Sequence, residues 1–468
     1  MKRSILLSTS IIFLTLILCA CGAGSPSFKV SANGESWYFG FGAEKIMPNE
    51  NSAQPLYIAG YNSALSISGV LDHCTAKSIY ISTGGSGILL IGIDCIALDS
   101  GTVKKIRASL SDIKNVDYIN VYSTHTHAGP DTLGLWGETG IDGKNDDYMA
   151  ELIKAAEACA RKAMSNIKSG SLFYSKTETK GMFRDSRDPI VTDDNLYQLR
   201  FCADDGTGGA RIYFYGAHAE SLRGANSLLS RDFPGMLCDG MEEKTGDMCM
   251  FAPGAIGGLV MTKEFVYDTT AQAVENLEIT SNKLIEYASS ITSDMERELA
   301  PKLSFVSEKF TVPLDNPAFL LYKTLGILTN DAVRYPGSAT GYGVRTELNL
   351  LMLDDIAIAL IPGEIFPELI SGKAYGNANP EKPENPKPLY DIAKEHGVSE
   401  LLIIGLANDE LGYIVPPSDF LLNEKLPYIE RTMDHKGEDH YEETNSVGPQ
   451  CAPIIAETFE KAIKRTGK

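Results

Sequence analysis

The chain has 468 residues, 43% of them hydrophobic, and a formal net charge of −19 at pH 7. This length and composition exclude a predominantly disordered protein and allow a large buried core. The acidic balance excludes nucleic acid and polybasic membrane binding as main roles, because both depend on many Lys and Arg side chains.

The first 20 residues predict a lipoprotein signal peptide. Lys2-Arg3 precedes an apolar run over 5–18, and the stretch ends in L-C-A-C. The run is short for a membrane span; a plain secretory signal or a transmembrane anchor is the alternative. Cleavage before Cys21 would leave this cysteine as a lipidated N-terminus. We therefore expect an extracytoplasmic protein, lipid-anchored to the bacterial cell membrane.

Residues 21–35 are rich in Gly, Ser and Asn, which predicts a flexible tether. The folded domain is expected over 36–468. Within it, the proline-rich stretch 376–388 predicts an exposed extended loop rather than a domain boundary.

Buried strands and helices alternate along this domain. Continuous apolar runs at 87–98 and 351–361 predict buried strands, and helical patterns occur at about 146–168 and 269–298. This alternation predicts an α/β fold, a layered mixed β-sheet core flanked by helices.

Two of the seven histidines lie one residue apart in V-Y-S-T-H-T-H-A-G-P-D-T (121–132). His125 and His127 have the same parity in an alternating stretch, so a strand would direct both imidazoles to one side. The strand would end at the following Ala-Gly-Pro, and such strand ends carry the chemistry of many α/β proteins. The pair predicts a metal or catalytic site; two hydrogen-bonded structural histidines are the alternative.

Further polar groups follow other strand-like runs. His218 follows Y-F-Y-G-A, Glu364 follows a buried run and a Pro-Gly turn, and Tyr413 follows L-L-I-I-G-L-A-N-D-E-L-G. A catalytic zinc takes three or four protein ligands and a water, so the remaining ligands are expected from strand ends such as these.

The order and wording of these segments resemble the catalytic domain of the neutral (alkaline, non-lysosomal) ceramidase family. The resemblance extends over about 38–468 and is carried by F-G-F-G-A-E-K-I-M-P, I-A-G-Y, G-V-L-D-H-C-T-A-K-S-I, T-H-T-H-A-G-P, H-A-E-S, I-P-G-E, G-L-A-N-D and Y-E-E-T-N-S-V-G-P. T-H-T-H-A-G-P is the most specific of these motifs.

The resemblance implies a site with two groups of residues. It implies zinc bound by His125, His218, Glu364 and Tyr413, and a substrate site lined by the catalytic residues His127, Arg187 and Tyr441. Histidine nitrogens and a carboxylate suit zinc, whereas a tyrosine oxygen is an unusual ligand. His440, which directly precedes Tyr441, is a further candidate for the pocket.

The chain departs from the family pattern in several places. Where the family has G-D-x-S-P-N, with a serine at the reaction centre, this chain reads G-G-L-V-M (257–261), which aligns Val260 with the serine. Extra residues lie between Tyr413 and Tyr441. The family also often carries an immunoglobulin-like domain after the catalytic one, whereas this chain ends about twenty residues after Gly448-Pro449. We therefore expect a divergent relative, for which a sphingolipid substrate is not implied.

These observations predict a lipid-anchored, zinc-dependent hydrolase that cleaves an amide (N-acyl) bond by attack of metal-bound water. The expected partners are a small-molecule or lipid N-acyl amide and the membrane, reached through Cys21. One alternative is a barrel-type amidohydrolase, although regular strand-helix repeats are not evident. The other is a catalytically degenerate binding lipoprotein with the same fold.

Overall fold

The structure is a computed structural model that describes residues 27–467, except for 186, 259–260, 263–268, 376–381 and 435. The expected signal peptide, Cys21 and Val260 lie outside the described residues.

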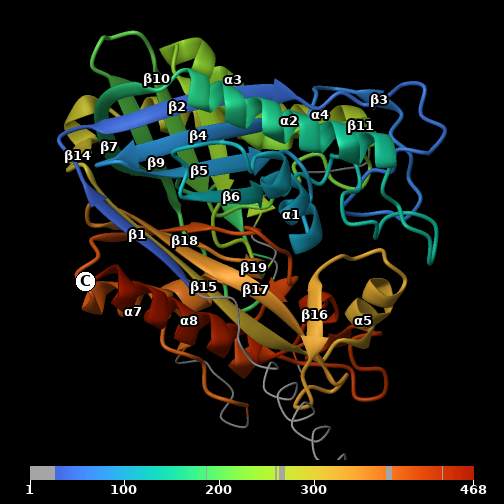
Figure 1. Cartoon of the computed structure of the whole chain (residues 1–468). Coiled ribbons are helices and arrows are strands. Elements are labelled where there is room, and N and C mark those ends of the chain that lie inside the picture. Colours follow the sequence, from blue (N-terminus) through green and yellow to red (C-terminus); the bar gives the residue numbers. More distant parts are fainter. Residues whose placement is uncertain are drawn as a thin grey trace, which may run out of the picture.

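The described chain forms four layers, two β-sheets packed face to face with helices on both outer sides (Figure 1). The first sheet is mixed and has the strand order β12-β10-β9-β7-β2-β4-β5-β6, with β14 paired to β7. Its strands are β2 (Trp37–Lys45), β4 (Thr75–Thr83), β5 (Ser86–Ile93), β6 (Tyr118–Ser123), β7 (Lys168–Glu178), β9 (Asn195–Ala203), β10 (Gly209–Tyr215), β12 (Met248–Pro253) and β14 (Arg297–Leu299).

The second sheet has the order β1-β15-β17-β18-β20, with β16 paired to β17. Its pairs are antiparallel except for β18 with β20. The strands are β1 (Phe28–Asn33), β15 (Lys302–Leu314), β16 (Asp331–Arg334), β17 (Tyr342–Leu353), β18 (Ile356–Leu360) and β20 (Glu400–Ile404).

Helices cover the outer face of each sheet. Packed on the first sheet are α1 (Ser100–Ser109), α2 (Asp146–Ser165), α3 (Asp232–Thr245) and α4 (Thr270–Ser289). Packed on the second are α7 (Leu389–Glu395) and α8 (Cys451–Thr466). Short connecting elements are α5 (Pro317–Thr324), α6 (Pro367–Ser371), β3 (Gly69–Val70), β8 (Phe183–Arg184), β11 (Leu228–Leu229), β13 (Met261–Thr262), β19 (Glu364–Ile365), β21 (Tyr413–Ile414), β22 (Thr432–Met433), β23 (Asp439–His440), and the 3₁₀ turns η1 (Ser293–Met295), η3 (Pro417–Asp419) and η4 (Glu442–Asn445).

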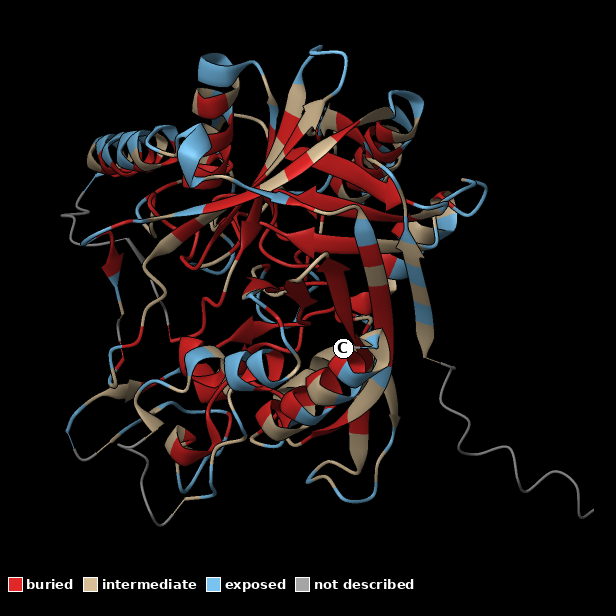
Figure 2. Cartoon of the chain, turned by 90° about the vertical axis from the view of Figure 1, so that its left-hand side faces the viewer, coloured by how far each residue is buried: buried red, intermediate tan, exposed pale blue. Residues whose placement is uncertain are grey.

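Both faces of the central strands are buried, as Figure 2 shows. In β18, Ile356 and Ile358 pack toward the first sheet, whereas Ala357 and Ala359 pack toward the helices. This two-sided burial explains the continuous apolar runs in the sequence. The predicted layered α/β fold is confirmed.

The first sheet curves strongly, so that its edge strands approach each other. The Tyr122 hydroxyl in β6 donates a hydrogen bond to the carbonyl oxygen of Phe251 in β12 at 2.8 Å. This curvature brings the ends of β6 and β10 together, where the candidate site lies.

Three boundaries differ from the sequence-based expectations. The run 351–361 is a hairpin rather than one strand, because Asp354 turns with φ +57° between β17 and β18. The helix expected to reach residue 298 ends at Ser289. Residues 28–33 of the expected tether form β1, because alternate side chains pack against β15.

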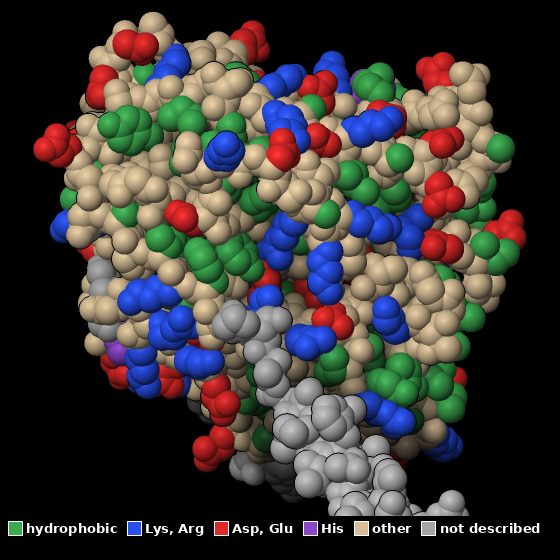
Figure 3. Space-filling view, in the orientation of Figure 1, with side chains coloured by type: hydrophobic (Ala, Val, Ile, Leu, Met, Phe, Trp, Pro, Cys, Tyr) green, Lys and Arg blue, Asp and Glu red, His purple; other side chains and the backbone are tan. Residues whose placement is uncertain are grey.

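Acidic and basic side chains are interspersed on the face shown in Figure 3, so the negative charge is distributed there rather than gathered into one patch. Among the described helices, none has the length and apolar character needed to cross a membrane.

Candidate active site

The histidines of T-H-T-H-A-G-P meet His218 where β6 and β10 end. Thr126 forms a parallel bridge with Ala219, and the His127 N–H donates to the Ala219 carbonyl oxygen at 2.9 Å. This bridge sets His125 and His127 beside His218, with the first two ring centroids 4.7 Å apart. The structure places both imidazoles on one side, but not by the predicted strand alternation, because β6 ends at Ser123 and His125 has a left-handed backbone conformation.

His125 is fixed by its backbone and by a hydrogen bond at its outer nitrogen. Its φ is +64°, a conformation that non-glycine residues adopt rarely and that often marks functional sites. The Nδ1 atom lies 2.7 Å from the Ile96 carbonyl oxygen. A carbonyl can only accept, so Nδ1 is the donor in this contact, and the tautomer it fixes in a neutral imidazole is the one that leaves the Nε2 lone pair for a metal.

Glu364 and Tyr413 lie side by side in the two-stranded pair β19 and β21, which follow β18 and β20 of the second sheet in the chain. After β18, the chain turns through Gly363 and enters β19, which pairs in parallel with β21 so that Glu364 faces Tyr413. A Cβ on Gly363 would lie 2.6 Å from the Gly412 carbonyl oxygen, and its φ is +156°. Glycine is thus required for this close approach.

Four candidate metal-ligand groups, three imidazoles and one carboxylate, converge between the two sheets. The Nε2 atoms of His125 and His127 are 3.1 Å apart. The Glu364 Oε2 atom lies 2.9 Å from Nε2 of His218 and 3.3 Å from Nε2 of His125. Metal-ligand bonds of about 2.0 to 2.1 Å in a tetrahedral zinc site put neighbouring ligand atoms roughly 3.3 Å apart. The donor set and its spacing therefore fit a metal such as zinc.

The three histidines form a group able to hold a metal ion. His127, expected to line the substrate site, thus also belongs to the potential ligands. Tyr413, expected as a ligand, lies with its ring stacked on His218 at a centroid distance of 6.5 Å. The structure brings all four predicted ligands and His127 together.

Burial and neighbouring charges shift the pKa values of these groups, in opposite directions for Glu364 and in the same direction for His127 and Tyr413. Burial disfavours ionisation of Glu364, but the neighbouring His125 and His218 outweigh it and hold its pKa well below its usual range. Burial, with His125 and His218 beside it, lowers the pKa of His127. Burial and the Glu364 charge raise the pKa of Tyr413.

Behind His127 lies a pair of residues that sequence reasoning did not select. Glu220 Oε2 is 3.9 Å from the His127 Nδ1 atom and accepts a hydrogen bond from the Tyr61 hydroxyl. Gly60 packs against the imidazole so closely that a Cβ would lie 2.5 Å from Nδ1. Both segments were visible as I-A-G-Y and H-A-E-S, but nothing in one sequence distinguishes these side chains as functional.

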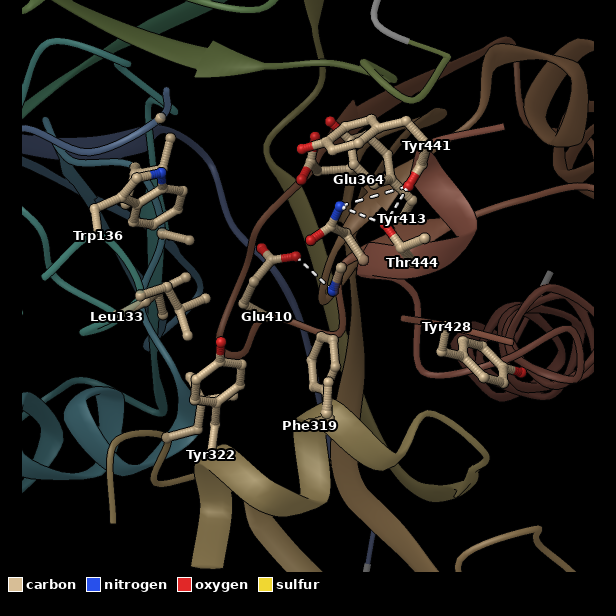
Figure 4. A pocket seen from close by; sticks show the side chains of 18 of the residues that line it. Leu133, Trp136, Phe319, Tyr322, Glu364, Glu410, Tyr413, Tyr428, Tyr441 and Thr444 are labelled. Carbon is tan, nitrogen blue, oxygen red and sulfur yellow. Dashed lines mark hydrogen bonds between the residues drawn. The ribbon is translucent and has the colours of Figure 1, made fainter. Parts of the chain in front are cut away.

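His125, His127 and Glu364 line one side of a cavity of about 600 Å³. Figure 4 shows Glu364, Tyr413 and Tyr441 at one side and apolar side chains on the opposite wall. Tyr441, a predicted site residue, lines this cavity and contacts Tyr413 at a ring-centroid distance of 6.0 Å. The apolar lining consists mainly of Leu133, Leu135, Trp136, Phe319, Leu321, Tyr322 and Leu328.

Glu410 also lines this cavity and was not predicted (Figure 4). Its Oε1 atom accepts a hydrogen bond from the Gly412 N–H at 2.7 Å, and Oε2 has no hydrogen-bond partner among the described residues. Burial, together with the Glu364 charge, raises the pKa of Glu410 well above its usual range. Its position between A-N-D and L-G-Y gave no signal of this environment.

Arg187, the third predicted site residue, is not among the residues that line this cavity. It is buried among carboxylates, with its guanidinium 2.9 Å from Glu442, 2.8 Å from Glu443 and 2.8 Å from Asp419. Its charge also lies 5.4 Å from the centre of the Phe366 ring. Arg187 therefore anchors η4, the turn that follows Tyr441.

His440 belongs to the same buried cluster. Its Nδ1 atom lies 2.9 Å from Glu443 Oε1, and its ring borders a separate polar cavity rather than the one beside the histidines.

The segment 257–261, which aligns with the family serine, is described except for residues 259 and 260. The Gly257 N–H donates to the Ile365 carbonyl oxygen at 3.0 Å, next to Glu364, and a Cβ there would lie 2.4 Å from the Phe366 ring. The segment therefore begins beside the donor groups, while Val260 lies outside the described residues.

Comparisons with known proteins agree with these motifs. No family model matches the chain. A neutral ceramidase of Drosophila pseudoobscura pseudoobscura is 23% identical over 251 residues, which cover 48% of this chain but only 34% of that protein. The crystal structure of neutral ceramidase from Pseudomonas aeruginosa superposes with a TM-score of 0.71 at 15% identity, over 92% of this chain and 74% of that chain. A ceramidase complexed with C2 gives a TM-score of 0.68 at 15% identity, over 92% and 75%. The chain thus has the fold of the catalytic domain of the neutral ceramidase family, as its motifs predicted.

Proposed function

We propose that the chain is a zinc-dependent hydrolase that cleaves the amide bond of an N-acyl amphiphile. One observation carries this proposal: the imidazoles of His125 and His218 lie 3.3 and 2.9 Å from the Glu364 carboxylate, a spacing that suits a zinc ion, beside a largely apolar cavity. The ceramidase-like fold agrees with a hydrolase of this type. A volume of about 600 Å³ is within the range of cavities that take small ligands.

In this proposal His125, His218 and Glu364 hold the metal, and Tyr413 completes the set. When bound, zinc supplies Lewis acidity, which polarises the substrate carbonyl and lowers the pKa of a water. The protein side chains would orient the substrate and handle the protons.

His127 is placed to take a proton at Nε2, which lies on the donor side of the cavity. Glu220, 3.9 Å behind Nδ1, would stabilise the resulting positive charge, and Tyr61 holds Glu220 in place. The hydroxyls of Tyr413 and Tyr441 are available to donate hydrogen bonds where negative charge develops on the carbonyl oxygen. The apolar wall would receive the acyl chain and exclude water.

Zinc content and turnover, measured together, test the proposal. The purified chain should bind close to one zinc ion and hydrolyse members of a panel of N-acyl amides. Turnover should be lost with chelator and restored by zinc. His125→Ala should lose both metal and activity, whereas His396→Ala, at the end of α7, should retain both. Binding of the amides without turnover would instead favour a degenerate binding lipoprotein. Absence of both binding and turnover would overturn the proposal.

We further propose that the protein acts outside the cytoplasm, anchored to the membrane by a lipid on Cys21. The L-C-A-C ending of a short apolar run supports this proposal. Cys21→Ala should remain unprocessed and lose its lipid label in cells fed a radioactive fatty acid. Normal processing and membrane partition of this variant would contradict the anchor.

A further inference from the structure

Glu410 is a buried carboxyl with one oxygen left unpaired inside the substrate cavity. It lies in the loop between β20 and β21 and is only 8% exposed. Oε1 accepts from the Gly412 N–H, while Oε2 has no hydrogen-bond partner in the described part of the chain. Buried polar atoms are rarely left unpaired, so an unpaired oxygen lining a cavity points to a missing ligand group.

The neighbouring acid shows what a structural carboxyl looks like in this loop. Asp409 Oδ1 accepts hydrogen bonds from the Ser100 N–H at 2.8 Å and from the Asn330 side chain at 2.6 Å. Its Oδ2 atom also has no hydrogen-bond partner among the described residues, but Asp409 does not line the cavity. Asp409 thus ties the loop to α1, whereas Glu410 contributes one hydrogen bond within its own loop. The fold does not use the second oxygen of Glu410.

Glu410 lacks a counter-ion among the described cavity residues, and its raised pKa favours the neutral acid until a cation binds beside it. No Lys or Arg is among the described residues that line the cavity. The other acid there, Glu364, is occupied by His125 and His218. A positively charged ligand group would give Glu410 a counter-ion, whereas a second anion would be repelled.

We propose that Glu410 is the counter-ion for an ammonium group of the substrate, so that the cavity selects N-acyl amphiphiles bearing a separate, positively charged amine. This inference rests on the proposed function and specifies its substrate class. The amide would lie at the histidines and Glu364, the ammonium at Glu410, and the alkyl chain along the apolar wall that includes Leu133 and Trp136 (Figure 4). Anionic and uncharged amphiphiles would bind more weakly.

Calorimetric titration of the full chain, loaded with zinc, tests this charge selection without requiring turnover. The probes are octylamine, octanol and octanoate at pH 7, which share one alkyl chain and differ in charge. We expect octylamine to bind at least ten-fold more tightly than octanol. Octanoate controls for direct binding of the probe to zinc, because a carboxylate is itself a zinc ligand. Equal affinities for octylamine and octanol would overturn the inference.

Glu410→Gln should reduce octylamine affinity at least ten-fold and leave octanol affinity within about two-fold, because it removes the charge but keeps the shape. Glu430→Gln is the matched control, since Glu430 is an exposed acid at the neighbouring surface cleft; it should change neither affinity. Unchanged octylamine binding by a folded Glu410→Gln protein would overturn the inference. If that variant does not fold, the comparison of octylamine with octanol on the wild-type chain still decides.

The proposed function has a separate readout. If amine-selective binding occurs but no N-acyl amide is hydrolysed by the zinc-loaded chain, the hydrolase proposal fails while the counter-ion role of Glu410 stands. If amides are hydrolysed at equal kcat/KM whether or not they carry a second amine, the hydrolase stands and the charge selection fails.

Discussion

Replacing Arg187 by Met should strongly destabilise the protein, because it leaves two buried carboxylates without their counter-ion. The Glu442 and Glu443 side chains are 2% and 0% exposed, and both contact the guanidinium. Burial alone would raise the pKa of Glu443, but His440 and Arg187 lower it to about 2. Methionine keeps most of the volume and removes the charge.

Two routes give a similar magnitude for this loss. Breaking a buried ion pair by removing one partner costs about 3 to 5 kcal/mol. Independently, lowering the pKa of Glu443 from 4.5 to about 2 corresponds to roughly 3 kcal/mol of stabilisation of the folded state, shared between His440 and Arg187. Since the folded-state pKa is the lower one, this stabilisation is present above pH 4.5 and is lost as the pH falls toward 2.

Urea unfolding at pH 7 and at pH 3, followed by two spectroscopic probes, measures the effect. We expect Arg187→Met to lose about 3 kcal/mol at pH 7 and less at pH 3. Arg431→Met is the control, because its ion pair with Asp439 is exposed and should contribute no more than about 1 kcal/mol. A variant of nearly wild-type stability with a raised KM would refute the anchoring role and show that Arg187 contacts substrate, as the family resemblance implied.

Three other changes test the site. Glu364→Gln should lower zinc affinity at least ten-fold in equilibrium dialysis, because a neutral amide is a poor ligand; unchanged affinity would exclude Glu364 from the metal site. Gly60→Ala should reduce kcat/KM about 10²-fold and retain zinc, because the added Cβ would displace the His127 imidazole. Undiminished activity of this variant would show that His127 is dispensable. Val260→Ser should raise ceramide hydrolysis ten-fold or more if residue 260 occupies the serine position; a folded variant with unchanged activity would show that the alignment through Gly257 is mistaken.

The sequence predicted those parts of the site that follow apolar runs or carry recognisable motifs. His125 and His127 do share one side, but the strand that was expected to carry them ends at Ser123, and the left-handed backbone of His125 could not be read from the alternation. His218 and Glu364 could be placed because each follows an apolar run. Glu410 could not be found in this way, because its burial and its unpaired oxygen exist only when both sheets and α5 surround it.

The fold was predictable in class but not in detail, for physical reasons that differ between elements. The hairpin 351–361 reads as one strand because both of its arms are buried on two faces, so only the Asp pair at its turn interrupts the apolar run. Strand β1 lies in a Ser- and Asn-containing stretch that reads as a loop. Its strand conformation depends on pairing with β15, in which partners such as Ser31 and Ser304 are 273 residues apart in sequence. Arg187 could be matched to a motif, but its burial among three acids could not be predicted, because these acids lie in turns far from it in sequence.

The donor groups of the candidate site follow strands of both sheets, and this has a consequence for the order of folding. During synthesis, residues 125, 127 and 218 emerge long before 364 and 413. Contacts of such large sequence separation form slowly, because the intervening chain must first be ordered. The full set of candidate ligand groups is therefore complete only after the two sheets have docked. Tight metal retention would then report completion of the whole domain rather than of either half, and metal would slow the separation of the two sheets in the finished protein.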